Sequence, residues 1–195
     1  MDEQREFLMR LIGLLDAAEI PYMLTGSLGS SFHGCPRATH DVDLVIAPAQ
    51  SQLQRFLSSI GPAYYVSEEA AMEAVRRESA FNVIDMDAQW KADLQVRRAR
   101  PFSLMEFSRR QKATVLGLDV WVVSPEDAIL SKLEWMKGRE SEVQYADAVG
   151  VAATQWKNLD VKYLLKWAQD LGVHDRLIEL LEQAKAESER CDSES

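Results

Sequence analysis

The chain has 195 residues, of which 47% are hydrophobic and 27% charged, and its formal net charge is -9. This length and balance are typical of a soluble globular protein and exclude a largely disordered chain. The negative charge argues against non-specific adhesion to nucleic acid, because that binding needs arrays of Lys and Arg against phosphates. The single basic candidate is the cluster of Arg97, Arg98 and Arg100.

The hydropathy pattern and the cysteines indicate a reduced, cytoplasmic protein without a membrane span. No run approaches 18 apolar residues, and the acidic start "MDEQREF" differs from the cationic start of a secretory signal. A disulfide between Cys35 and Cys191 would have to pin a polar C-terminal tail, so reduced thiols are expected.

In the first 124 residues, hydrophobic periodicity and turn residues predict strands interleaved with helices. The predicted helices cover residues 2–19, a short segment within 27–34, 49–60 and 67–79. The predicted strands cover residues 22–26, 39–47, 64–66, 81–84, 91–96, 112–117 and 119–123. The last two strands surround Gly117 and predict a hairpin.

From Ser124 onward the pattern is helical. Ser124 is a good N-cap, Pro125 suits the first helical position, and two acids occupy the first turn. Three more helices are predicted over residues 142–155, 160–172 and 174–188. The predicted fold class is α+β: a mixed sheet flanked by helices in residues 1–124, and a helical C-terminal region, residues 125–190, packed on it.

Two aspartates interrupt the apolar strand "THDVDLVIA". Side chains two apart in a strand point to the same face, so Asp41 and Asp43 project together while Val42 and Leu44 point into the core. Two carboxylates this close repel each other unless a divalent cation, an Arg or a Lys lies between them. Mg²⁺ fits well, since it takes one or two protein carboxylates and completes its shell with water and phosphates.

Two further features join this pair. Asp93 interrupts the strand "KADLQV", and its carboxylate would reach the same metal if that strand pairs beside the first. The turn at Gly26 and Ser27 follows a strand and opens a helix, where backbone N–H groups and the Ser27 hydroxyl suit phosphate oxygens. A cluster of acids holding two metal ions is typical of phosphoryl transfer by in-line displacement.

This order of a strand, Gly-Ser, Asp-x-Asp in an apolar strand and a later strand Asp resembles the nucleotidyltransferase fold of polymerase beta-like, antibiotic and minimal nucleotidyltransferases. The helical end and "SPEDAILSKLEW" are most similar to toxin-type nucleotidyltransferases of abortive-infection and toxin-antitoxin systems. The resemblance covers about residues 20–150. One departure is Leu28, which follows Ser27 where the family often has a small residue.

The resemblance implies a nucleotidyltransferase that moves a nucleoside monophosphate from ATP or another NTP to an acceptor. It implies metal binding, with Mg²⁺ or Mn²⁺, and catalysis by Asp41, Asp43 and Asp93, and triphosphate contacts by Gly26 and Ser27. The acceptor class stays open among a small RNA, a protein and a small molecule, and an antitoxin is a possible partner. The alternative is an inactive protein of this fold that serves as a nucleotide-binding or partner-docking module.

Two basic residues are further nucleotide-binding candidates, each with a plainer interpretation. Arg37 either contacts phosphate or neutralises the Asp41 and Asp43 pair. Lys132 lies on the apolar stripe of its helix, where a charge is costly unless it reaches a ligand or an acid. The plainer interpretation of Lys132 is that its stem packs and its ammonium reaches water.

Overall fold

The computed structural model describes residues 2–34 and 36–193, and the chain divides into two compact units. We call residues up to Thr25 together with Ala38–Val122 the sheet unit, and Gly26–Arg37 together with Val123 onward the helical unit. The helical unit therefore takes in a short segment from early in the chain. Cys35, and with it the expected lack of a disulfide to Cys191, lies outside the described residues.

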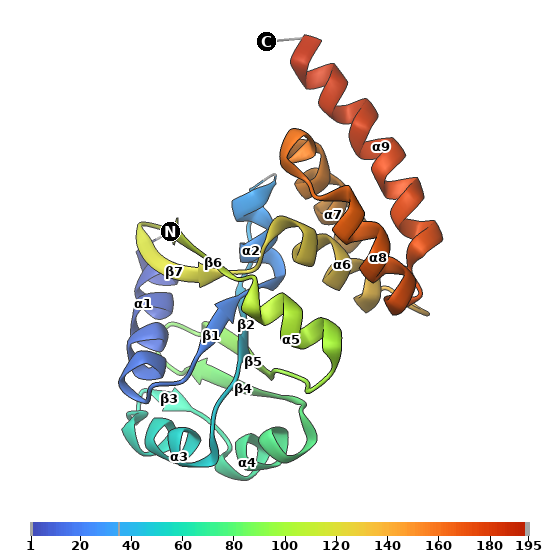
Figure 1. Cartoon of the computed structure of the whole chain (residues 1–195). Coiled ribbons are helices and arrows are strands. Elements are labelled where there is room, and N and C mark those ends of the chain that lie inside the picture. The colour runs from blue at the N-terminus through green and yellow to red at the C-terminus, as the bar shows by residue number, and fades with distance from the viewer. Residues whose placement is uncertain (1, 35, 194–195) are drawn as a thin grey trace. The chain divides into compact units, whose positions relative to one another are not determined.

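The sheet unit is built on a seven-stranded mixed sheet in the order β3-β4-β5-β2-β1-β7-β6 (Figure 1). Its strands are β1 (Tyr22–Leu24), β2 (Asp41–Ile46), β3 (Tyr64–Tyr65), β4 (Ala80–Asp85), β5 (Lys91–Val96), β6 (Gln111–Val115) and β7 (Leu118–Val122). The pairs β2–β5 and β1–β7 are parallel and the other pairs antiparallel. All seven predicted strands form, and the hairpin of β6 and β7 turns at Gly117, whose φ is 74°.

The helices of the sheet unit are α1 (Asp2–Ala17), α3 (Gln50–Ser59), α4 (Glu68–Arg77) and α5 (Pro101–Ser108). The apolar stripe of α1 that predicted a helix is its buried face, with Phe7, Leu8, Leu11 and Leu15 fully buried. Helix α4 begins as expected, because the Ser67 side chain accepts a hydrogen bond from the Ala70 backbone N–H.

Helix α5 is absent from the sequence prediction, which placed no helix or strand between residues 96 and 112. Pro101 at its first turn is a start signal, but the helix has little one-sided periodicity. Phe102 and Phe107 are buried, whereas Leu104 and Met105 are 42% and 40% exposed. Apolar residues therefore lie on both sides of α5, and packing of the two phenylalanines selects the helix.

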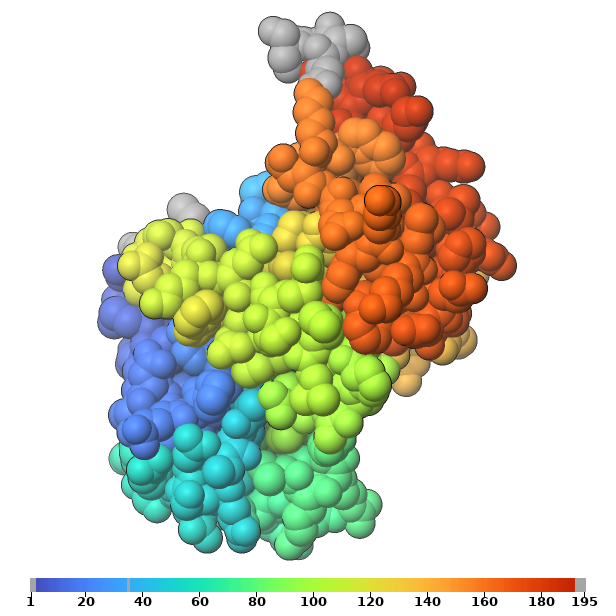
Figure 2. All heavy atoms as spheres, in the orientation of Figure 1, coloured from blue at the N-terminus to red at the C-terminus, as the bar shows by residue number. Residues whose placement is uncertain are grey.

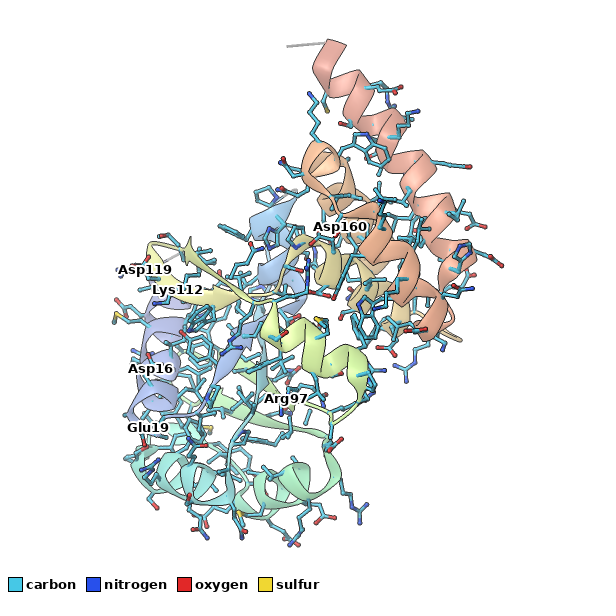
Figure 3. The ribbon with its side chains drawn as sticks, in the orientation of Figure 1. Asp16, Glu19, Arg97, Lys112, Asp119 and Asp160 are labelled. Atoms are coloured by element: carbon cyan, nitrogen blue, oxygen red, sulfur yellow. The ribbon has the colours of Figure 1, made fainter. Side chains whose placement is uncertain are left out.

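The helical unit consists of α2 (Gly26–His33), α6 (Pro125–Trp135), α7 (Glu142–Thr154), α8 (Val161–Leu171) and α9 (His174–Ser193), with a 3-10 turn at Trp156–Asn158. The predicted Ser124 cap forms, because its side chain accepts from the Asp127 N–H. Asp160, labelled in Figure 3, caps α8 in the same way by accepting from the Tyr163 N–H. Asp127 is fully buried, and its carboxylate accepts hydrogen bonds from the Ser124 hydroxyl and the Tyr163 hydroxyl, each at 2.6 Å. This bond to Tyr163 joins α6 to α8.

Helix α2 is fixed within the helical unit at its C-terminal end. The His33 Nε2–H donates to the Val123 carbonyl at 2.6 Å, which assigns the neutral ring its proton. Burial lowers the pKa of the His33 imidazole, although the Val123 carbonyl and the charge of Glu126 oppose this shift. The next residue, Gly34, lies so close to α7 that a Cβ there would be 2.7 Å from the Val151 backbone nitrogen.

No helix among residues 2–34 and 36–193 combines the length and the apolar character needed to cross a membrane.

The close approach at Gly34 predicts that Gly34→Ala destabilises the protein. The added methyl would meet backbone atoms of Gly150 and Val151, which cannot move without shifting α7. We expect the free energy of unfolding in urea to fall by about 1–3 kcal/mol. Gly13→Ala is the matched control, because a Cβ at Gly13 in α1 meets no atom within 4 Å. That variant should gain up to about 1 kcal/mol from helix propensity, and equal losses in the two variants would contradict the packing argument.

Candidate active site

The parallel pairing of β2 and β5 brings the three predicted acids onto neighbouring strands. Asp43 lies opposite Asp93 in the register, and Asp41 lies opposite Lys91. The alternate residues of both strands are buried, among them Val42, Leu44, Ala92 and Leu94, all fully. The apolar alternation therefore fixes the acids and Lys91 on the opposite face of the sheet.

Lys91 lies between two of these carboxylates and was not singled out from the sequence. Its Nζ is 3.1 Å from Asp93 Oδ2 and 3.7 Å from Asp41 Oδ1. Burial disfavours the ammonium, but the hydrogen bond to Asp93 and the two acidic charges outweigh it and raise the pKa of Lys91. The need for a positive charge between the acids is thus met by a lysine two residues before Asp93. Its position in "KADLQV" was the available signal.

The carboxylates of β2 and β5 suit a divalent cation, provided that the Lys91 ammonium is displaced. Asp93 Oδ1 is buried and has no hydrogen-bond partner among the described residues, so it is an acceptor in need of a donor or a cation. In the described part of the chain, no group of three or more His, Cys, Asp or Glu side chains is gathered closely enough to hold an ion. Mg²⁺ needs only one or two carboxylates, so the residues fit it once the Lys91 ammonium moves away.

The backbone also ties β2 to the strand that precedes the Gly-Ser turn. The Thr25 N–H donates to the Asp43 carbonyl oxygen at 2.9 Å, at the end of β1. Gly26 follows with φ of 58°, in the left-handed region that glycine adopts without strain. A glycine is therefore favoured where the chain leaves β1 and begins α2.

The helical unit contains a second cluster of charged side chains, centred on Asp147 of α7. The Arg37 Nε–H donates to the two oxygens of Asp147 at 3.0 and 3.2 Å, and Arg37 Nη2 donates to the Ser27 hydroxyl. Lys132 Nζ donates to Asp147 Oδ2 at 2.9 Å and to Gln144 Oε1 at 2.7 Å. The structure thus brings together three of the four predicted nucleotide-binding residues: Ser27, Arg37 and Lys132.

The burial of Lys132 tests whether its ammonium reaches water or an acid. The side chain is 6% exposed, and the Asp147 side chain is 10% exposed. The interpretation in which the ammonium extends into water is therefore wrong, because the charge is buried and paired with an acid. Asp147 and Gln144 were not among the predicted site residues. The two residues lie one turn apart on α7, which begins at the Ser141 cap.

Comparison with known proteins identifies the fold. An antigenic nucleotidyltransferase-like protein from Paracoccidioides brasiliensis is 17% identical, with a TM-score of 0.57 over 94% of each chain. The antibiotic-resistance factor ANT(2'')-Ia is 13% identical, with a TM-score of 0.50 over 90% of this chain and all of that one. No protein-family model and no curated protein matches this sequence. At such identities the likeness concerns the fold, which is the one predicted.

The position of Lys91 predicts a competition between its ammonium and a divalent cation. In Lys91→Met the carboxylates lose their neutralising charge, so Mg²⁺ should raise the melting temperature more than it does in the wild-type protein. The measurement is a thermal unfolding series over increasing MgCl₂ at one ionic strength. Lys162→Met, an exposed position on α8, is the control and should respond as the wild type does. A Lys91→Met variant indifferent to Mg²⁺ would contradict the proposed cation site.

The Asp147 cluster predicts a coupling measurable by a double-mutant cycle. Asp147→Ala removes a carboxylate that pairs with the buried Lys132 ammonium and should cost about 3–5 kcal/mol of unfolding free energy. Adding Lys132→Met should recover part of that loss, because the buried ammonium that Asp147 neutralised is then removed as well. Urea unfolding of the two single variants and the double variant measures the coupling. Asp170→Ala, at an exposed position of α8, should change stability by less than about 0.5 kcal/mol. Additive effects of the two cluster substitutions would show that Lys132 and Asp147 are not coupled.

Proposed function

We propose, from the nucleotidyltransferase fold of the chain, that it transfers a nucleoside monophosphate from an NTP to an acceptor and releases pyrophosphate. The observation that carries this proposal is the register of β2 on β5, which sets Asp43 opposite Asp93 on the same face as Asp41. A sheet stabilised by apolar contacts alone has no need of three carboxylates side by side, because they repel one another.

The proposed ligands of Mg²⁺ or Mn²⁺ are drawn from Asp41, Asp43 and Asp93, of which one or two suffice for each ion. A divalent cation held there would neutralise charge on the phosphates and lower the pKa of the attacking hydroxyl. The Asp93 carboxylate would accept the proton of the acceptor hydroxyl. The acceptor oxygen then forms a bond to the α-phosphorus, and the bond from that phosphorus to the bridging oxygen of pyrophosphate breaks.

The proposed phosphate contacts come from Gly26, Ser27, Arg37 and Lys132. Gly26 begins α2, where backbone N–H groups point outward from the first turn, and the Ser27 hydroxyl adds a polar group. Arg37 and Lys132 are both anchored on Asp147, so their cationic groups are held in fixed positions before any ligand arrives. Fixed donors bind a triphosphate with less loss of side-chain entropy than mobile ones.

Lys91 favours the second candidate function, an inactive protein of this fold that docks a nucleotide or a partner. Its ammonium already neutralises Asp41 and Asp93, which removes the electrostatic reason for a metal. Isothermal titration calorimetry with NTP, in the presence and absence of Mg²⁺, separates the two candidates. Mg²⁺-dependent NTP binding supports the enzyme, whereas NTP binding that ignores Mg²⁺, or none, supports the docking module.

The proposed biological setting rests on the family resemblance, which leaves the acceptor class open. A toxin of a toxin-antitoxin or phage-defence system, held by an antitoxin protein, is the setting that the "SPEDAILSKLEW" helix favours. Incubation with α-labelled NTPs and fractionated cell lysate would show whether RNA, protein or a small molecule takes up the label.

The decisive variant is Asp43→Asn, which keeps the shape of the side chain and removes its charge. We expect transfer of the labelled nucleotide to fall by at least about 1,000-fold, because a proposed metal ligand is lost. Circular dichroism should be unchanged, since Asp43 is on the face opposite the buried residues of β2. Asp170→Asn, on α8, should retain full transfer. Wild-type transfer by Asp43→Asn would refute the assignment.

A further inference from the structure

Basic residues gather in one segment of an otherwise acidic chain. Residues 97–114 contain six basic residues and one acid, whereas the chain has a net charge of -9. The basic residues are Arg97, Arg98, Arg100, Arg109, Arg110 and Lys112. Helix α5 folds this segment back on itself, so that residues before and after the helix meet. All of it lies in the sheet unit.

Three cations from this segment alternate with two aromatic rings. The Arg97 guanidinium carbon lies 5.4 Å from the centroid of the Phe107 ring, and that of Arg110 lies 4.2 Å from the same ring. Arg110 is also 5.0 Å from the Trp121 ring, which Lys112 Nζ approaches to 5.2 Å. We call Arg97, Arg110 and Lys112 with these two rings the cation row. Figure 3 labels Arg97, just beyond β5, and Lys112 on β6.

The row is short of negative charge. The Nε atoms of Arg97 and Arg110 are buried and have no hydrogen-bond partner among the described residues. Burial lowers the pKa of Arg110, and the nearby charge of Arg97 adds to the effect. Asp119, the acid on the neighbouring strand β7, already accepts a hydrogen bond from the Thr114 hydroxyl at 2.8 Å. Like charges held this close favour an anion that binds them together.

The row also remains open to solvent. Lys112 is exposed, and Arg97, Arg110 and Trp121 are partly exposed. In Figure 2 the yellow-green atoms of this part of the chain lie at the molecular surface. The cations therefore can be reached by a large ligand, and their stacking on rings holds them in place before it binds.

We propose that the cation row is a docking surface for the phosphodiester backbone of a single-stranded nucleic acid. Such a strand repeats one negative charge per nucleotide, which matches a line of separate cations better than one compact phosphate does. A positively charged surface that follows the backbone is typical of proteins that hold single strands without sequence preference. This docking does not depend on the proposed nucleotidyl transfer, since it needs neither an NTP nor a metal.

Fluorescence anisotropy with a labelled twenty-nucleotide oligouridine, without NTP or divalent cations, tests the proposal. We expect saturable binding that weakens with salt, with a slope of log affinity against log salt of about -2 for three phosphate contacts. Lys112→Glu should weaken binding by about tenfold or more at low salt and bring the slope closer to zero by about 0.7 or more. Lys112 is exposed, so this variant should fold, and circular dichroism checks that it does.

The matched control is Lys162→Glu, which makes the same charge change at an exposed position of α8 and should bind as the wild type does. The double variant Arg97→Gln/Arg110→Gln should lose binding further than Lys112→Glu. Absent binding, or equal affinities for Lys112→Glu and Lys162→Glu, would overturn the proposal. Displacement of the RNA by an equal concentration of polyglutamate would overturn it in favour of an acidic protein partner. Equal or tighter binding of a duplex of the same length would overturn the single-strand assignment.

Discussion

The register between β2 and β5 is the constraint on which the candidate site depends. The two strands are parallel, and each buries every second residue, so their polar residues share one face. A slip of one residue would turn Asp43 or Asp93 into the core and expose Leu44 or Leu94. The hydrophobic effect therefore holds the carboxylates in place, although they repel one another and contribute nothing to the core themselves.

Charge is balanced differently in the two units. In the sheet unit the ammonium of Lys91 lies between Asp41 and Asp93, at positions that stay partly exposed. In the helical unit a single carboxylate, Asp147, holds two cations, and the pair with Lys132 is nearly buried. The exposed balance around Lys91 can be exchanged for another cation at low cost, whereas the buried balance at Asp147 cannot. The sheet unit thus carries the adaptable charges, and the helical unit the fixed ones.

The fold could be predicted from the sequence to a large extent. Strand alternation gave all seven strands, and capping residues such as Ser67 and Ser124 placed helix starts correctly. Helix α5 was missed because its apolar residues do not fall on one side. Because this helix was not predicted, the cation row was missed as well. Arg97 and Arg110 reach the same Phe107 ring only because the residues between them fold as α5.

The sequence by itself determined which side chains share a face, because that depends on local periods. Asp41 and Asp43 share one face of their strand, and Val42 and Leu44 share the other. The interrupted strand around Asp93 and the turn at Gly26 and Ser27 added these three residues, whose proposed roles remain predictions. Only the tertiary structure decided which partners these groups meet, such as Lys91 between the acids and Asp147 between Arg37 and Lys132. Arg37 and Asp147 are 110 residues apart. No local period reaches that far, because such pairs are set by how whole strands and helices pack.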